Sequence, residues 1–307
     1  MIILHWALPV TAWVLAPLLL GIINRVKAIF AGRRGQPLLQ LYFDLFKLLR
    51  KGSVYSRSTS TVIRIAPSAG LACMALATML LPWGGLRAPA AFAGDIVLLA
   101  YLLGLARFMT VLAALDTGSA FEGMGASREV QFAALAEPSF FLGMLVLVLQ
   151  SGALGLSNIM SGLSATTWQT SGMLLILVAC SWFVLLLTEN SRIPIDDPNT
   201  HLELTMIHEV MVLDYSGPDL AYVLYGASLK LWIFAALIVN LIVPARSLPV
   251  AVQIPLFLLG MGVVAVLVGI VESILARLRL QQVPKVLIGS AALSIIALIV
   301  QLMGSQT

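Results

Sequence analysis

The stretch TENSRIPIDDPNTHLELTMIHEVMVLDYSGPD, residues 188–219, separates two long apolar segments and sets the layout of the chain. It holds seven of the fourteen acidic residues and two of the three histidines. Pro194 and Pro198 prevent a continuous helix through its first half. A polar stretch of this length between apolar segments is either a functional surface or a solvated spacer.

The composition around this stretch is that of a membrane protein. Of 307 residues, 60% are hydrophobic and only 10% are charged, whereas a soluble domain carries about 25% charged residues. The chain is therefore predicted to be an all-α polytopic membrane protein that folds as one domain over residues 1–307. The expected surroundings of the chain are a lipid bilayer, and its net charge of +4 gives no reason to expect that it binds nucleic acid.

Apolar runs long enough to cross a bilayer recur along the chain, since about 20 residues span the hydrocarbon core as a helix. About eight such helices are predicted, at roughly 2–24, 62–83, 95–116, 131–151, 171–188, 219–244, 250–276 and 284–304. The predicted cytoplasmic loops are about 25–61, 117–130, 189–218 and 277–283.

The distribution of lysine and arginine predicts the orientation. If the 25–61 loop is cytoplasmic, fourteen of the eighteen basic residues lie on that side or at the helix ends facing it. Arg87 and Arg246 lie on the opposite side, and Arg107 and Lys230 lie within spans. This asymmetry predicts that both termini are outside and that residues 188–219 face the cytoplasm.

The first loop contains an amphipathic segment, PLLQLYFDLFKLLRK, residues 37–51. Gln40, Asp44, Lys47 and Lys51 form a narrow polar stripe on an otherwise apolar helix. Such a helix lies in the membrane interface. It is either a simple anchor or one wall of an entrance for a lipid-soluble substrate.

The chain has few groups able to hold a metal or a cluster. Cys73 and Cys180 lie in separate apolar runs without a CxxC pattern. His201 and His208 lie on one face of a short helix expected from Thr200, but their spacing brings no third ligand. We therefore expect no metal site and no catalytic residue in this chain, and a contact surface for a soluble partner on residues 188–219.

Ionisable residues within the spans are functional candidates, because burying a charge in a bilayer is costly. Arg107 and Lys230 lie near the middle of their spans, and the acidic residues lie toward the cytoplasmic ends. The predicted ion-path set is Arg107, Asp116, Glu137, Glu189, Lys230 and Glu272. These groups form either static ion pairs or a proton or ion path; the sequence leaves both open.

Six motifs occur in one order along the chain and identify a family. They are RRGQPLLQLYFDLFKL (33–48), LDTGSAFEGMGASRE (115–129), ENSRIPIDD (189–197), DYSG (214–217), SLK (228–230) and ESILARLRL (272–280). With these motifs the chain resembles the respiratory complex I subunit 1 family over about residues 25–285. Within it, the chain is most similar to the membrane subunit of formate hydrogenlyase-type, membrane-bound nickel–iron hydrogenases.

The resemblance implies an arm-docking or quinone-chamber loop set, carried over by position. Its members here are Arg33, Arg34, Gln40, Asp44, Lys47, Arg192, Pro194, Asp196, Glu203 and Asp214. It also implies a non-catalytic subunit that anchors a peripheral redox arm and helps to couple electron transfer to proton or sodium translocation. The implied partners are hydrogenase-like large and small subunits, iron–sulfur subunits and antiporter-like membrane subunits in the cell inner membrane.

Two alternatives remain beside this interpretation. The chain could be the quinone-chamber subunit of a quinone-reducing, NADH dehydrogenase-like complex, or a free-standing ion transporter. The nickel–iron centre and the iron–sulfur clusters are expected in partner subunits, and quinone is the one cofactor that this chain would itself contact. PIDDPNTHLEL, DYSG and Lys230 depart from the complex I pattern, which argues against quinone reduction more than against docking of the arm.

Overall fold

A computed structural model describes residues 2–196, 206–244 and 248–304. The described residues form helices joined by loops, without a named strand. The helices are α1 (Ile2–Phe30), α2 (Gln40–Leu49), α3 (Val62–Thr78), α4 (Asp95–Asp116), α5 (Ala120–Ser151), α6 (Leu156–Gly162), α7 (Ala165–Glu189), α8 (Gly217–Ile242), α9 (Val250–Ile274) and α10 (Val283–Gly304), with short 3₁₀ turns η1 (Glu209–Val212) and η3 (Leu280–Gln282).

Among the described residues, seven helices are long and apolar enough to cross a membrane, and α3 is a shorter apolar helix. The prediction of an all-α polytopic membrane fold is thereby confirmed. The second predicted span, 62–83, is longer than the helix in the structure, which ends at Thr78. Residues 83–86 form a tight turn in which the backbones of Trp83 and Leu86 exchange hydrogen bonds.

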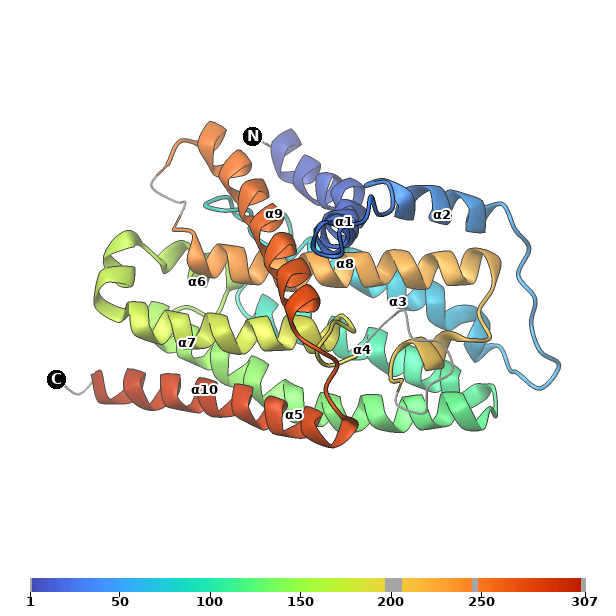
Figure 1. Cartoon of the computed structure of the whole chain (residues 1–307). Helices are drawn as coiled ribbons and strands as arrows, with labels where there is room; N and C mark the ends of the chain where they lie inside the picture. The colour runs from blue at the N-terminus through green and yellow to red at the C-terminus, as the bar shows by residue number, and fades with distance from the viewer. Residues whose placement is uncertain (1, 197–205, 245–247, 305–307) are drawn as a thin grey trace.

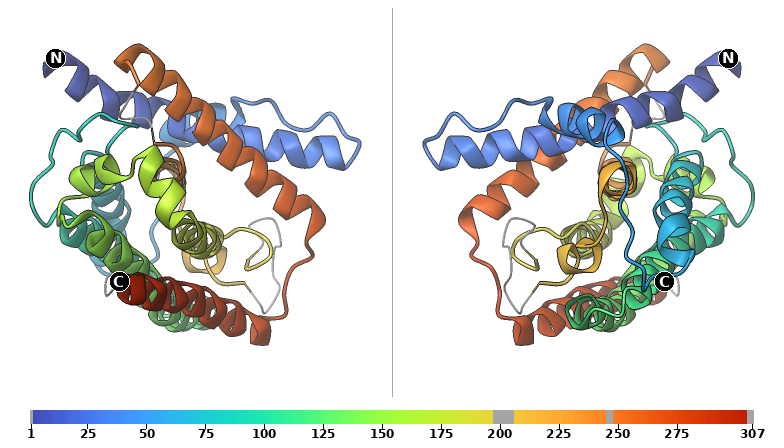
Figure 2. Two further views of the ribbon diagram at one scale, coloured as in Figure 1. Left: turned by 90° about the vertical axis from the view of Figure 1, so that its left-hand side faces the viewer. Right: turned by 90° about the vertical axis from the view of Figure 1, so that its right-hand side faces the viewer.

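The long helices pack around α8. In its most apolar 18-residue segment 67% of the residues are buried, the largest share among these spans. Viewed along the bundle, α1 and α9 lie on one side of α8, and α5 and α10 lie on the opposite side (Figure 2). In Figure 1 the C-terminus of α10 lies at the left end of the bundle, and the connection that follows α2 lies at the right end. The central position of α8 brings Lys230 next to helices from both halves of the chain.

Small polar residues let α10 approach α5 and α7 closely. The Ser139 hydroxyl lies 2.9 Å from that of Ser290, and the Ser181 hydroxyl lies 2.8 Å from that of Ser294. All four serines are buried. Small residues that exchange hydrogen bonds are the usual means of holding helices together in lipid.

The largest departure from the predicted elements concerns α5. Residues 117–130 are predicted as a loop, but α5 begins at Ala120 and continues to Ser151. No proline interrupts residues 120–137, and the glycines there are tolerated because Gly125 packs against residues 207–211. The helix therefore extends well beyond the predicted span.

The third predicted loop, residues 189–218, contains regular structure in its described part. The helix expected from Thr200 begins outside the described residues, and its described end is the 3₁₀ turn η1. This segment folds back onto α5, as the contacts below establish.

Candidate functional site

Arg107, on α4, binds three carboxylates. Its Nε lies 3.1 Å from Glu129 Oε1, its Nη1 lies 2.7 Å from Glu137 Oε1, and its Nη2 pairs with Glu189 Oε1. The Arg107 side chain is only 13% exposed. A guanidinium can serve three acceptors at once because it carries five N–H groups in a fixed plane.

Lys230 of α8 completes this group, with its Nζ 2.6 Å from Glu189 Oε2. Glu189 therefore lies between two cations, and its side chain is 8% exposed. We call Arg107, Glu129, Glu137, Glu189 and Lys230 the intramembrane cluster. Its members come from α4, α5, α7 and α8, so the cluster forms only when these helices pack together.

His208 joins the intramembrane cluster to the polar segment that precedes α8. Its Nε2 lies 3.0 Å from Glu129 Oε2, and its Nδ1 lies 3.3 Å from Asp196 Oδ2. The other oxygen of Asp196 lies 3.3 Å from Arg277 Nη2. A continuous series of charged contacts thus runs from Arg277 through His208 to Arg107.

The charges around His208 control its protonation. Burial of the imidazole lowers its pKa, but Glu129 and Asp196 outweigh burial and raise the pKa of His208 to about 9. Burial raises the pKa of the Asp196 carboxyl, and His208 and Arg277 reverse this and hold it below its usual range. His208 is therefore an imidazolium at neutral pH, and Asp196 is a carboxylate.

The first part of α5 holds residues 206–214 in place. Arg128 Nη1 donates to the Met206 carbonyl at 2.9 Å, and the Asp214 N–H donates to Glu122 Oε1 at 3.1 Å. Between them Gly125 lies so close that an added Cβ would be 2.9 Å from the Ile207 carbonyl oxygen. The absence of a side chain at Gly125 allows the backbone carrying His208 to lie directly on α5.

A second set of ion pairs surrounds Glu272 at the end of α9. Glu272 Oε2 lies 2.8 Å from Lys27 Nζ, and Oε1 lies 3.4 Å from Arg192 Nη1. The Glu272 side chain has no exposed surface. These pairs tie α1 and α9 to the residues that follow α7.

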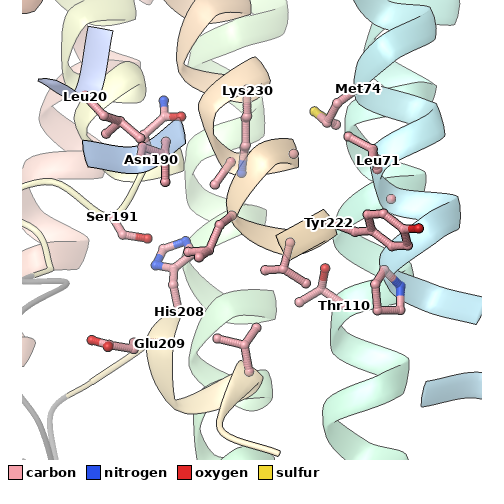
Figure 3. A pocket seen from close by; sticks show the side chains of 18 of the residues that line it. Leu20, Leu71, Met74, Thr110, Asn190, Ser191, His208, Glu209, Tyr222 and Lys230 are labelled. Carbon is pink, nitrogen blue, oxygen red and sulfur yellow. The ribbon is translucent and has the colours of Figure 1, made fainter. Parts of the chain in front are cut away.

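A cavity of about 430 Å³ adjoins the intramembrane cluster. Arg107, Glu129, Glu189 and Lys230 contribute to one part of its lining, and Leu20, Leu71 and Met74 to another. Figure 3 places the His208 ring and Lys230 between Asn190 and Ser191 on one side and Leu71 and Met74 on the other. Gln40 and Asp44 of α2 also line the cavity, with Gln40 Nε2 2.9 Å from Asp44 Oδ1.

A second cavity of about 550 Å³ lies on the other side of the cluster. It shares Leu103, Arg107 and Glu189 with the first cavity and adds Glu137, whose side chain is 51% exposed. Apolar residues such as Tyr101, Phe108 and Phe141 form the rest of its lining. Arg107 and Glu189 therefore stand in the wall between two cavities.

The predicted ion-path residues thus fall into three places. Arg107, Glu137, Glu189 and Lys230 come together in the intramembrane cluster, and Glu272 belongs to the second set. Asp116 accepts a hydrogen bond from the Ser60 N–H at 2.8 Å. In the part of the chain that the structure describes, no ion pair joins Asp116 to either set.

The predicted loop residues are more dispersed. Asp196 and Arg192 lie in the charged contacts described above, and the Pro194 carbonyl accepts from the Leu278 N–H at 2.9 Å. Arg33, Arg34, Lys47 and Asp214 are exposed. Glu203 lies outside the described residues.

Sequence reasoning missed two members of the site, Glu129 and the bridging role of His208. Glu129 was predicted to lie in a loop, although its spacing of seven from Glu122 would place both on one face of a helix. Recognising α5 from Ala120 would have revealed this acidic stripe. Nothing in the sequence alone indicates that His208 approaches Glu129.

Comparisons with known proteins cover nearly the whole chain. The family model described as NADH dehydrogenase matches residues 2–302. Hydrogenase-4 component C of Escherichia coli (strain K12) is 34% identical over 285 residues, which are 91% of this chain and 89% of that protein. Formate hydrogenlyase subunit 4 of the same organism is 32% identical over 280 residues, covering 88% and 89%.

A solved structure has the same fold. A chain of the membrane-bound sulfane sulfur reductase, an archaeal respiratory membrane complex, superposes with a TM-score of 0.82 at 18% identity. The match covers 98% of this chain and 99% of that one.

Proposed function

Because the chain belongs to the complex I subunit 1 family, which the NADH dehydrogenase model describes, we propose that it anchors the redox arm of a membrane-bound hydrogenase of the formate hydrogenlyase type. It is a complex I-like membrane subunit, and its relatives named above are components of hydrogenase-4 and formate hydrogenlyase. In this proposal the subunit also helps to couple electron transfer to proton or sodium translocation. In this proposal both termini lie on the side of the inner membrane opposite to the cytoplasm.

The single observation that carries the coupling role is the intramembrane cluster. Two cations and three carboxylates lie within spans, between two cavities. Ionisable groups are expensive in a membrane and are retained there chiefly for transport of charge or for binding. A carboxylate that shares its cation with two others can take up a proton at less cost, because the cation remains neutralised.

The docking role is supported by the gathering of polar segments at one end of the bundle. Residues 189–196 and 206–216, together with the first part of α5, meet there and are joined to the cluster through His208. A partner that binds these segments would contact groups connected to Glu129 and Arg107 by ion pairs. We propose hydrogenase-like large and small subunits as that partner, with iron–sulfur subunits beyond them and antiporter-like subunits alongside in the membrane.

The redox centres belong to the partners in this proposal. Among the described residues no group of three or more histidine, cysteine, aspartate or glutamate side chains has the geometry of a metal site. The two cysteines are free, one buried and one exposed. The chain's own contribution is then to position the arm and to hold charges whose protonation responds to it.

Replacing Glu137 with Gln tests the coupling role. Glu137 is the best choice because its side chain is 51% exposed, whereas Glu129 and Glu189 are each 8% exposed and each binds a second positive group, His208 or Lys230, besides Arg107. We expect redox turnover of the whole complex to persist and ion translocation per electron pair to fall by roughly tenfold or more. The measurement is ion uptake by proteoliposomes that contain the complete complex.

Asp116→Asn is the matched control, because Asp116 lies outside the intramembrane cluster and asparagine retains an oxygen that accepts from Ser60. The control should translocate ions at the wild-type ratio. Wild-type translocation in the Glu137→Gln complex would contradict the coupling role.

A second candidate function, a quinone chamber, is favoured by one observation. The 430 Å³ cavity has apolar lining from α1 and α3 and is bounded by Gln40 and Asp44 on the amphipathic helix α2. A cavity of this size fits a lipid-soluble ring with polar groups at one end. Stoichiometric quinone in a solvent extract of the purified complex would favour this function over the hydrogenase-type one.

A further inference from the structure

The 550 Å³ cavity opens at the surface between α4 and α5, and the proposed function assigns it no occupant. Large exposed side chains form its rim: Tyr101 is 73% exposed, Phe108 54% and Phe141 49%. Its inner wall contains Arg107 and Glu189, which are 13% and 8% exposed. We call this opening the α4–α5 groove.

The α4–α5 groove lies within the membrane-spanning parts of both helices. Arg107 is about 14 Å along the axis from the end of α4 at Asp116, and Glu137 binds Arg107 and so lies at the same level. The Glu137 side chain is nevertheless 51% exposed. Because the core of a bilayer holds no water to solvate a carboxylate, a half-exposed one at this depth needs a protein group to cover it.

The charges around the guanidinium in the groove show what kind of group would cover Glu137. Of the three carboxylates that this guanidinium binds, Glu129 has His208 as a second positive partner, and Glu189 has Lys230. Within the described ranges, the ion pair of Glu137 is with the guanidinium alone. Since Glu137 lines the groove, a second positive partner for it would come from outside the chain.

The wall of the groove on α4 has the shape that accepts a helix. Ala100 and Gly104 are one helical turn apart and both line the groove. A Cβ added at Gly104 would meet no atom within 4 Å, so the space beside it is open. In lipid, small residues four positions apart let a second helix approach closely. A loop does not fit here, because its backbone polar groups would lack partners in the hydrocarbon.

We propose that the α4–α5 groove binds a transmembrane helix of another subunit, and that this helix places a lysine or arginine beside Glu137. The inference rests on the proposed function in one respect, that the chain works in a complex with other membrane subunits. The helix covers the apolar rim of the groove. Its cation gives Glu137 the second positive partner that Glu129 and Glu189 already have.

Other occupants fit the groove less well. Lipid acyl chains match the apolar rim but leave Glu137 without a second positive partner. A second copy of this chain has Arg107 and Lys230 near the middle of its spans, and both are already paired within the chain. Charge complementarity therefore favours a helix with a cation of its own.

Photo-cross-linking from the rim identifies the occupant. A benzophenone amino acid at Tyr101 replaces one large exposed ring with another and leaves the intramembrane cluster unchanged. In the purified complex, we expect it to cross-link to a transmembrane peptide of another subunit that contains a lysine or arginine. The control is the same amino acid at Leu259 of α9, which is 65% exposed outside the groove and should not give that peptide.

Gly104→Leu fills the groove from its own wall. We expect the cross-linked subunit to copurify with the chain at a level lower by roughly tenfold, because overpacking a contact weakens it, while the redox arm is retained. Gly262→Leu of α9 is the matched control, since a Cβ there also meets no atom within 4 Å. If Gly104→Leu fails to fold, the cross-link from Tyr101 still decides the question.

A double-mutant cycle tests the ion pair. Glu137→Gln, and replacement of the cross-linked cation by methionine, should each lower retention of the partner subunit in detergent by roughly fivefold. Both changes together should lower it no further than one alone, because the two groups serve each other. Independent, multiplying effects would contradict the ion pair.

The remaining outcomes separate the inference from the proposed function. Cross-links from Tyr101 only to lipid, to a second copy of this chain, or to a helix without a lysine or arginine would overturn the inference. Unchanged copurification in Gly104→Leu would do the same. In these cases the other membrane subunits still copurify, and the proposed function stands. A chain that purifies without any other membrane subunit would contradict both.

Discussion

At the scale of single residues, the site is organised by groups that serve more than one partner. Arg107 is shared by Glu129, Glu137 and Glu189, and Glu129 is shared by Arg107 and His208. Removing one member of a buried ion pair typically costs about 3–5 kcal/mol. Substitution of Arg107 would remove the cation that binds Glu137 and one of the two positive groups beside Glu129 and Glu189, and would damage folding. Peripheral members such as Glu137 and His208 are therefore the informative ones.

The raised pKa of His208 predicts a pH dependence of local stability. Because the folded pKa of about 9 lies above the ordinary histidine pKa of 6.5, the imidazolium stabilises the fold fully below pH 6.5, and this contribution is lost as pH rises through 9. The upper limit is about 3 kcal/mol. We expect hydrogen exchange in residues 206–216, corrected for its intrinsic pH dependence, to accelerate between pH 6.5 and 9.5.

His208→Gln removes the titrating group and serves as the control for this measurement. In that variant the protection of residues 206–216 should be lower at pH 6.5 and nearly constant up to pH 9.5. An identical pH dependence in the variant and the wild type would contradict the assignment of the transition to His208.

Sequence reasoning located most of these charges but not their partners. Arg107, Lys230, Glu137 and Glu189 are identified by their positions within apolar spans, because hydropathy marks any charge there as exceptional. Their pairing depends on the rotation and packing of four helices, which a single sequence does not encode locally. Asp116 illustrates the limit: it ends a span as Glu189 does, yet it accepts from a loop amide.

At the scale of elements, α5 connects residues 206–214 with the intramembrane cluster. Its first turns hold residues 206–214 through Glu122, Gly125 and Arg128, and Glu129 and Glu137 follow on the same helix. A displacement of residues 206–214 would therefore be transmitted to Arg107 through one rigid element. The structure provides a mechanical connection as well as the electrostatic one through His208.

Substituting Gly125 with Val tests this connection. A Cβ at Gly125 would approach the Ile207 oxygen to 2.9 Å and Met211 Cγ to 3.0 Å, and overpacking of this kind costs about 1–3 kcal/mol. We expect faster proteolysis and hydrogen exchange of residues 206–216 and weaker retention of the redox arm. Limited proteolysis and hydrogen exchange of the assembled complex measure the first effect, and the amount of arm that copurifies with the chain measures the second.

Gly123→Val, on the same helix, is the matched control, since a Cβ at Gly123 would have no neighbour within 4 Å. Both substitutions introduce the same β-branched residue in place of glycine in α5, so the change in helix propensity is common to them. Equal effects at the two positions would show that propensity, and not contact with residues 206–211, accounts for the result.

The extent of α5 also shows where element prediction fails. Hydropathy places a span at 131–151, whereas the helix begins at Ala120. The additional turns are polar on one face, and what stabilises them is contact with residues 206–214, far along the sequence. Hydropathy locates the parts of helices that contact lipid, but it has no information on the parts that contact another loop.

At the scale of the whole molecule, the chain is a bundle with one asymmetric end. Hydropathy predicts about eight spans, and the described residues contain seven helices long and apolar enough to cross a membrane together with the shorter apolar helix α3. The polar segments and α2 lie at the same end of the bundle (Figure 1), and residues of both line the 430 Å³ cavity. A subunit of this form has a surface to anchor an arm and buried charges to respond to it.

The most direct test of this account is purification of the chain from its native membranes in a mild detergent, with identification of the associated proteins and assay of nickel, iron and quinone. The account predicts nickel and iron together with a hydrogenase-like large subunit, in a fixed ratio to this chain. Iron and quinone without nickel would instead indicate the quinone-reducing complex. A chain that purifies intact and alone, without a redox metal, would contradict the proposed role as an anchor of a redox arm.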